Sequence, residues 1–250
     1  MGVLSVLIPT WTPSPSALMI APGELHIWRA RLDLADAVLD RLATTLSEAE
    51  QAKANRLRMA PHRRAAIASR GILRSLLGQY LQHSPHALQF AYTPHGKPQI
   101  AAPVPPIPIE FNLSHSDQVI LLAIRLQDSV GIDVEAHRPM PLLSNLLQRY
   151  FSPQEQAAIA AADQPEQEFF YYWTAKEALT KATGYGLTDL SRVTLQPSDT
   201  TLQAQYYRDS PVSMPWQVQC FSPHPGYAAA VAYRAPQSLH CRWFDWSIEC

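Results

Sequence analysis

The chain contains two segments of similar design, separated by 105 positions. Ser47 and Ser152 each open a Ser-x-x-Glu pattern, in which the two side chains satisfy free amides at the start of a helix. Pro153 follows the second serine at the first helical position, where its missing N–H costs nothing. The same offset relates the runs Leu25–Ala30 and Val130–Glu135, which alternate apolar and other residues as half-buried strands do.

Each capped start leads into a long helix with an apolar stripe, and each segment closes on a strand-like run, Val119–Ile124 or Tyr227–Tyr233. Capped helices and alternating strands are common, so chance similarity is the alternative. The repeat predicts an α+β fold built as a pseudo-dimer of two similar α/β halves. We expect an N-terminal arm at 1–20, a first half at 21–126, and a second half with a C-terminal tail at 127–250. The cleft between the halves is where a ligand is expected.

Composition narrows the class of protein. Hydrophobic residues make up 47% of the 250 positions and charged residues 16%, which favours a sizeable core over disorder. A net charge of −1 argues against a nucleic-acid partner, since binding along phosphate backbones needs basic excess. The three cysteines lack CxxC spacing, which favours a reducing, cytoplasmic location over a disulfide framework.

Two observations bear on membranes and export. No run of about 18 apolar residues is present, so no membrane partner is expected. The apolar stretch Val3–Pro9 has no basic segment before it, and prolines interrupt it and the residues that follow. We therefore interpret the first residues as a loose arm and not as a signal peptide.

The run Gly131–Glu135 places Asp133 and Glu135 on one face of a strand, because residues two apart point to the same side. Two adjacent carboxylates repel each other unless a positive group lies between them. A hard divalent cation such as Mg²⁺ prefers such oxygen ligands. The alternative is a solvent-facing strand edge, with ordinary salt bridges to Arg138 or Arg149.

The run from Trp173 to Lys181 predicts a helix on which Trp173, Glu177 and Lys181 share one face, since they recur every four residues. This spacing is also typical of a plain Glu177–Lys181 pair, worth about 0.2–0.5 kcal/mol. Lys176 lies one residue round the helix from Glu177, where it could position that carboxylate or bind an anion.

Three further pieces could bind phosphate. In the segment Phe111–Asp117 we expect a strand end and a polar turn, where Ser114, His115 and Ser116 could bind a phosphate. The alternative is a turn capped by Asn112 and Ser116, with His115 merely exposed. The tight loop His95–Pro98 projects Lys97, although a surface hairpin explains it equally well. A concentration of basic residues follows the first capped start: Lys53, Arg56, Arg58, Arg63, Arg64, Arg70 and Arg74.

Taken in order, G-K-P, F-N-L-S-H-S, G-I-D-V-E and W-T-A-K-E-A-L-T-K resemble the motifs of the Sfp-type 4′-phosphopantetheinyl transferases. The motifs cover about Leu46 to Leu187, and the repeat extends the resemblance over nearly the whole chain. The resemblance implies two α/β halves with the active site between them. It also implies transfer of the phosphopantetheine arm of coenzyme A to a serine of an apo acyl or peptidyl carrier protein, with release of adenosine 3′,5′-bisphosphate.

The same resemblance assigns roles to residues. Asp133, Glu135 and Glu177 correspond to Mg²⁺ ligands, and Glu177 corresponds to the general base, with Glu135 as the alternative. Lys181 corresponds to a catalytic contact with the pyrophosphate, to which Lys176 could also bind. The residues implied for the 3′-phosphate region of coenzyme A are Ser114 and His115, with Lys97 nearby and Lys53 and Arg64 as further ligands. Some family members carry a lysine about where Glu50 stands, so this part of the pocket can differ.

The resemblance and the internal repeat also predict the partner protein and the oligomeric state. Carrier proteins of this kind are usually acidic helical bundles, so an apolar surface with basic neighbours would suit them. The candidates are Leu142, Leu143, Leu146, Leu147, Arg149 and Tyr150, with core packing as the alternative. The internal repeat favours a monomer. Rival readings are a non-catalytic module that binds coenzyme A or a carrier, and an unrelated metal-dependent hydrolase or nucleotidyl transferase. Neither rival accounts for the three acids and both phosphate motifs together.

Overall fold

The computed structural model describes residues 4–15, 17–184, 187–198, 201–206, 216–234 and 239–247. The first half contains β3 (Glu24–Arg31), α1 (Asp36–Ala43), α2 (Glu48–Asn55), α3 (Ala60–Leu81), the 3-10 helix η1 (Pro85–Ala87), β4 (Gln89–Tyr92), β5 (Pro98–Ala102), β6 (Ile109–Ser116) and β7 (Val119–Leu126). The second half contains β8 (Val130–Ala136), α4 (Leu143–Tyr150), α5 (Pro153–Ala160), α6 (Pro165–Thr183), the 3-10 helix η2 (Leu187–Arg192), β9 (Val193–Ser198), β10 (Thr201–Tyr206), β11 (Trp216–Phe221) and β12 (Tyr227–Tyr233).

The internal repeat is confirmed in three dimensions. Both predicted capping boxes form, at Ser47 before α2 and at Ser152 before α5. Strands β3, β7 and β6 are neighbours in one sheet, and β8, β12 and β11 are neighbours in the other, so equivalent strands have the same order. The halves differ in the placement of one hairpin: β10 and β9 extend the second sheet, whereas β4 and β5 form a separate hairpin in the first half.

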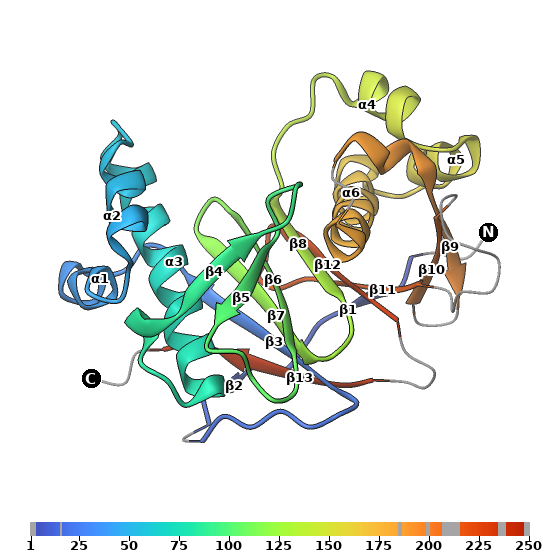
Figure 1. Cartoon of the computed structure of the whole chain (residues 1–250). Helices are drawn as coiled ribbons and strands as arrows, with labels where there is room; N and C mark the ends of the chain where they lie inside the picture. Colours follow the sequence, from blue (N-terminus) through green and yellow to red (C-terminus); the bar gives the residue numbers. More distant parts are fainter. Residues whose placement is uncertain are drawn as a thin grey trace.

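The two sheets pack face to face between two layers of helices (Figure 1). One apolar cluster joins α3 to the outer face of the first sheet, and another joins α6 to the outer face of the second. A third cluster lies between the sheets and contains Leu25 and Leu121 from one, with Ile132, Val134 and Val231 from the other. The α+β pseudo-dimer predicted from the sequence is therefore the observed architecture.

The ends of the chain cross from one half to the other. The N-terminal strand β1 (Val6–Leu7) pairs with β11 of the second sheet, and Leu4 is buried beside it. The C-terminal strand β13 (His240–Asp245) pairs in parallel with β3 of the first sheet, and β2 (Thr12–Pro13) pairs with β13. The loose arm expected at 1–20 is therefore wrong where β1 and β2 form, at Val6–Leu7 and Thr12–Pro13. The boundaries at 21–126 and 127–250 stay a prediction, and the sheets cross them.

Two sequence expectations concern cysteines and membranes. Cys220 and Cys241 are free thiols, whereas Cys250 lies outside the described residues. Among the described helices, none combines the length and apolar composition that a membrane-spanning segment needs.

The glutamate of each capping box also anchors the long helix of its half. Glu50 accepts a hydrogen bond from Arg74 of α3 at 2.6 Å, and Glu155 forms an ion pair with Lys176 of α6 at 2.9 Å. Lys176 is 1% exposed, and its ammonium also donates to the carbonyls of Tyr150 and Val193. The pyrophosphate-binding role considered for Lys176 is therefore wrong, because its donors are directed into the core.

The crossing of β8 and α6 depends on Gly131. A Cβ atom added to Gly131 would lie 2.0 Å from the carbonyl oxygen of Ala178 and 2.4 Å from the amide nitrogen of Ala182. Both atoms belong to the backbone of α6, so no side-chain rotation can relieve the overlap. Glycine at this position therefore permits the strand and the helix to approach this closely.

We expect Gly131→Ala to lower the free energy of unfolding by about 1–3 kcal/mol, because the strand and helix must separate to admit the methyl group. Chemical denaturation with a spectroscopic readout measures this change. Wild-type stability in the variant would contradict the close approach.

We expect Lys176→Met to destabilise the fold by about 3–5 kcal/mol, because it leaves the Glu155 carboxylate buried without its cation. Adding Glu155→Gln in the same chain removes that charge and keeps an oxygen for the capping box, so the double variant should regain part of the loss. Equal stability of the single and double variants would argue against a buried ion pair. Denaturant titration of the three proteins provides the comparison.

Candidate functional site

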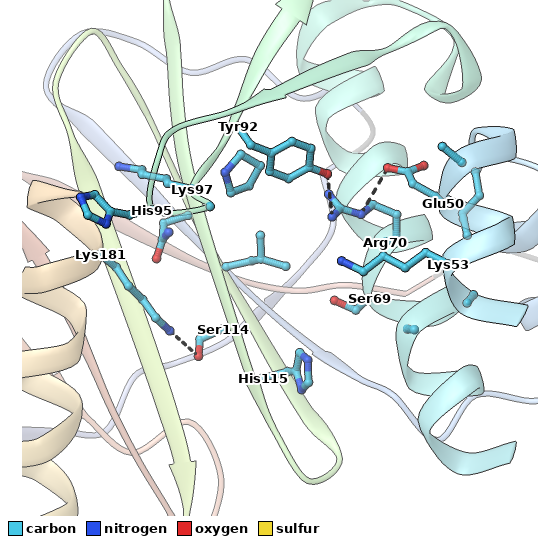
Figure 2. A pocket seen from close by; sticks show the side chains of 18 of the residues that line it. Glu50, Lys53, Ser69, Arg70, Tyr92, His95, Lys97, Ser114, His115 and Lys181 are labelled. Carbon is cyan, nitrogen blue, oxygen red and sulfur yellow. Dashed lines mark hydrogen bonds and ion pairs between the residues drawn. The ribbon is translucent and has the colours of Figure 1, made fainter. Parts of the chain in front are cut away.

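A cavity of about 880 Å³ opens where α2 and α3 of the first half face α6 of the second. Its size suits a ligand of cofactor dimensions. Figure 2 shows Lys53 and Arg70 on one side, Lys181 on the other, and Ser114 and His115 on the strand between them. The lining also includes Glu50, Ser69, Tyr92, His95, Lys97, Asn112, Glu177 and Thr180. The cleft predicted between the two halves thus contains side chains from both.

Asp133 lies behind the cavity wall and is 4% exposed. Its Oδ1 accepts hydrogen bonds from Ser114 Oγ at 2.7 Å and from Lys181 Nζ at 2.7 Å, and Lys181 also donates to Ser114 Oγ at 2.8 Å. Its Oδ2 is buried and has no hydrogen-bond partner. Burial raises the pKa of Asp133, and the Lys181 ammonium and the Ser114 hydroxyl oppose that shift.

Glu177 and Glu135 complete the acidic group. Glu177 projects from α6 into the cavity wall, and burial together with the charge of Asp133 raises its pKa to about 7. Glu135 lies two residues beyond Asp133 on β8, where its Oε2 accepts from Ser116 Oγ at 3.0 Å and from Arg138 at 2.8 Å. Lys181 therefore pairs with Asp133 and not with Glu177, contrary to the simple helix pair considered above.

The polar turn expected at Phe111–Asp117 is wrong in its position. Strand β6 continues through Ser116, and the chain turns only at Asp117, which has a φ of 49°. Alternate side chains of this strand, Asn112, Ser114 and Ser116, hydrogen-bond to β8. His115 lines the cavity and is exposed.

Lys53 lines the cavity, as the resemblance implies, and so does Lys97, whose ammonium donates to the carbonyl of Val130 at 3.1 Å. The structure does not bring Arg64 to the cavity. Its guanidinium forms an ion pair with Asp36 and donates to the carbonyl of Leu34.

Arg70 reaches the cavity from α3, where it pairs with Glu50 at 3.3 Å and donates to the Tyr92 hydroxyl at 3.2 Å. In the sequence analysis Arg70 is one of seven basic residues grouped from Lys53 to Arg74, with no individual assignment. Helical spacing was the signal available: Ala66, Ser69 and Arg70 share the face that lines the cavity, and Arg64 does not.

The residues present fit a magnesium ion in their donor chemistry. Carboxylate oxygens are the ligands that Mg²⁺ prefers, and the free buried Oδ2 of Asp133 is one such oxygen. Ion pairs with Lys181 and Arg138 supply part of the positive charge that the acids need. Within the described part of the chain, no group of three or more His, Cys, Asp or Glu side chains has an arrangement that could hold a metal ion, so the fit is one of donor chemistry alone.

The arrangement can bind an elongated anion and polarise one end of it. The first half supplies cationic side chains along the cavity, and the second supplies a lysine beside partly desolvated carboxylates. The lysine can stabilise negative charge at a phosphorus centre, and a carboxylate beside it can accept a proton from an attacking hydroxyl.

Comparison with known proteins matches both halves to family models of 4′-phosphopantetheinyl transferases. Residues 129–232 match the family model of the 4′-phosphopantetheinyl transferase superfamily, and residues 34–127 match the model described as 4′-phosphopantetheinyl transferase, N-terminal. HetI, a 4′-phosphopantetheinyl transferase of Nostoc sp., is 41% identical over 74% of this chain and 78% of its own length.

Two further relatives agree. A putative 4′-phosphopantetheinyl transferase of Synechocystis sp. is 32% identical over 69% of this chain and 70% of its own length. The Sfp protein of Bacillus subtilis is 30% identical over 66% of this chain and 71% of its own length. The chain, with both halves matched, belongs to the Sfp-type 4′-phosphopantetheinyl transferases.

Proposed function

We propose that the chain transfers the 4′-phosphopantetheine arm of coenzyme A to a serine of an acyl or peptidyl carrier protein, in an Mg²⁺-dependent reaction that releases adenosine 3′,5′-bisphosphate. One observation carries the proposal: Lys181 of one half donates to Ser114 of the other, and both line, together with Glu177, a cavity with basic walls. Family membership supports the reaction class, and the geometry supports the roles of the residues.

Coenzyme A would lie along the cavity, with its phosphates paired to side chains from both halves. Lys53 and Arg70 are available at the α2–α3 end for the 3′-phosphate, and His115 lies on the strand between them and Lys181. Lys181 stands at the second-half end, where the pyrophosphate would contact it. This placement directs the phosphorus centre toward Glu177.

In the transfer, the carrier serine oxygen forms a bond to the phosphorus atom that bears the pantetheine arm. The bond from that phosphorus to the bridging oxygen breaks, and adenosine 3′,5′-bisphosphate leaves with the electron pair. Mg²⁺ held by oxygens of Asp133, Glu135 and Glu177 would reduce the repulsion between the serine oxygen and the phosphate oxygens. Lys181 stabilises charge on the pyrophosphate as the bond breaks.

The serine proton needs a carboxylate acceptor, and the geometry favours Glu177. Glu177 lines the cavity, whereas Glu135 is already engaged by Ser116 and Arg138. Ser114 is held between Asp133 and Lys181, so in this proposal it orients those two groups beside the coenzyme.

Fewer residues of this chain are exposed for contact with a carrier protein than the sequence analysis proposed. Leu143, Leu146 and Leu147 of α4 are partly buried against the second-half core. Leu142 is 63% exposed at the start of the helix, and Arg149 is exposed near its end. We propose this exposed pair as the contact for an acidic carrier helix.

The direct test incubates the purified chain with an apo carrier protein, coenzyme A and MgCl₂, followed by mass spectrometry of the intact carrier. We expect one added phosphopantetheine on a serine and an equal amount of adenosine 3′,5′-bisphosphate. Omission of coenzyme A, or chelation of the metal, should leave the carrier unmodified. An unmodified carrier in the complete mixture, tested across fatty-acid, polyketide and peptide-synthetase carriers, would contradict the proposal.

We expect Asp133→Ala and Glu177→Ala each to lower turnover about 100-fold or more, because each removes charge stabilisation or proton acceptance at the reacting phosphorus. Circular dichroism should report a folded chain in both. Asp163→Ala, which removes an exposed acid from the turn between α5 and α6, serves as the matched control. Near-normal activity of Asp133→Ala at limiting Mg²⁺ would exclude its role in holding the metal.

We expect Arg70→Gln to raise the KM for coenzyme A roughly tenfold with little change in kcat, since one charge-assisted contact in the ground state is lost. His115→Ala should change KM in the same direction. Arg41→Gln, on α1, is the control. The assay also tests Arg64: if its ion pair with Asp36 is its role, Arg64→Gln should leave KM unchanged, and a rise would restore it as a phosphate ligand.

A further inference from the structure

The outer edge of β8 is closed by side chains from the first half. β8 is an edge strand of the second sheet and β6 is an edge strand of the first, and the two belong to separate sheets. An edge strand carries unpaired backbone groups that need partners when they are buried. The amide of Ile132 donates to Asn112 Oδ1 at 2.9 Å, and the amide of Ala136 donates to Ser116 Oγ at 3.1 Å.

Between these two residues on β6, Ser114 hydrogen-bonds to a side chain of β8 and not to its backbone. Ser114 Oγ donates to Asp133 Oδ1 at 2.7 Å. Asn112, Ser114 and Ser116 are two residues apart, as a strand requires for side chains on one face. Together they form a side-chain ladder that replaces a backbone ladder between the two halves.

Ser116 makes two hydrogen bonds that fix the direction of its hydroxyl. A hydroxyl has one proton to donate, and its oxygen can accept. Its oxygen accepts from the Ala136 amide, and its proton goes to Glu135 Oε2 at 3.0 Å. The hydroxyl therefore couples the backbone of β8 to the carboxylate at the end of the same strand.

Arg138 reaches the same carboxylate oxygen as Ser116. Its guanidinium donates to Glu135 Oε2 at 2.8 Å and is half exposed, so solvent weakens its hold. Ser116 is shorter, and its backbone contact fixes its position. The serine is therefore the donor better suited to set the direction of the Glu135 carboxylate.

We propose that Ser116 is a positioning residue, the last rung of a ladder through which the first half orients the Glu135 carboxylate of the second. This inference rests on the proposed function, because it takes Glu135 to be an Mg²⁺ ligand. Side chains that orient a ligating carboxylate commonly change metal affinity or activity by about 10–100-fold when they are removed.

The test uses the full chain with coenzyme A and no carrier, so that no turnover occurs while Mg²⁺ binding is measured. MgCl₂ is titrated into the complex, and its affinity is read by calorimetry or by the rise in Tm. The proteins compared are the wild type, Ser116→Ala and Ser116→Thr, which keeps a hydroxyl. Ser75→Ala on α3 is the matched control. Steady-state loading of an apo carrier then gives kcat and the KM for coenzyme A.

We expect Ser116→Ala to weaken Mg²⁺ binding roughly tenfold and to lower kcat by a similar factor, while the KM for coenzyme A changes little. Ser116→Thr should recover most of both losses, and Ser75→Ala should match the wild type. A merely structural serine would lower Tm in every condition and leave the Mg²⁺ affinity unchanged, and that result would overturn the proposal.

Other outcomes also decide it. A raised KM for coenzyme A with unchanged kcat would assign Ser116 to coenzyme binding and overturn the positioning role. If the wild-type chain loads the carrier and the Ser116→Ala chain has equal kcat and Mg²⁺ affinity, the positioning role of Ser116 is rejected and the proposed function stays intact. A wild-type chain that shows no Mg²⁺ response in its coenzyme A complex would overturn both the positioning role of Ser116 and the proposed Mg²⁺ dependence of the reaction.

Discussion

The close approach of β8 and α6 at Gly131 is the contact on which the site depends. The strand carries Asp133 and Glu135, and the helix carries Glu177 and Lys181. With no side chain at Gly131, the two backbones approach to a distance at which Lys181 can reach Asp133 at 2.7 Å. A larger residue would push the strand from the helix and separate the acids from the lysine.

The two halves are alike in topology and have diverged in chemistry. The first half supplies Lys53, Arg70 and Lys97, and the second supplies the three acids. The hairpin β4–β5 departs from the first sheet, whereas its counterpart β9–β10 stays in the second. That departure brings the Lys97 ammonium to the carbonyl of Val130, at the start of the strand that carries the acids.

The sequence predicted those features that follow from periodicity and local capping. The offset between Ser47 and Ser152 identified two halves, and alternation along Gly131–Glu135 put both acids on one face of a strand. These patterns are local, so they survive without knowledge of the tertiary packing. The burial of Ile132 and Val134 between the sheets agrees with that alternation.

Predictions for residues whose contacts lie far away in the sequence were less accurate. The polar run at Ser114–Ser116 was predicted to be a turn, because it has the polar composition of a loop. Its serines are polar because they hydrogen-bond to β8 of the other half. Arg64 and Arg70 are equivalent by composition, and only the position of Asp36 and of the cavity separates them. Lys176, next to Glu177 in the sequence, points instead to Glu155 in the core.

A structure of the chain bound to coenzyme A and Mg²⁺ tests the central claim, that the reacting site is shared between the halves, most directly. We expect the adenosine end beside Lys53, Arg70 and His115 of the first half. The pyrophosphate should contact Lys181, with the metal bound by carboxylate oxygens of Asp133, Glu135 and Glu177. Coenzyme A held entirely by one half, or its pyrophosphate bound away from Lys181, would contradict the account.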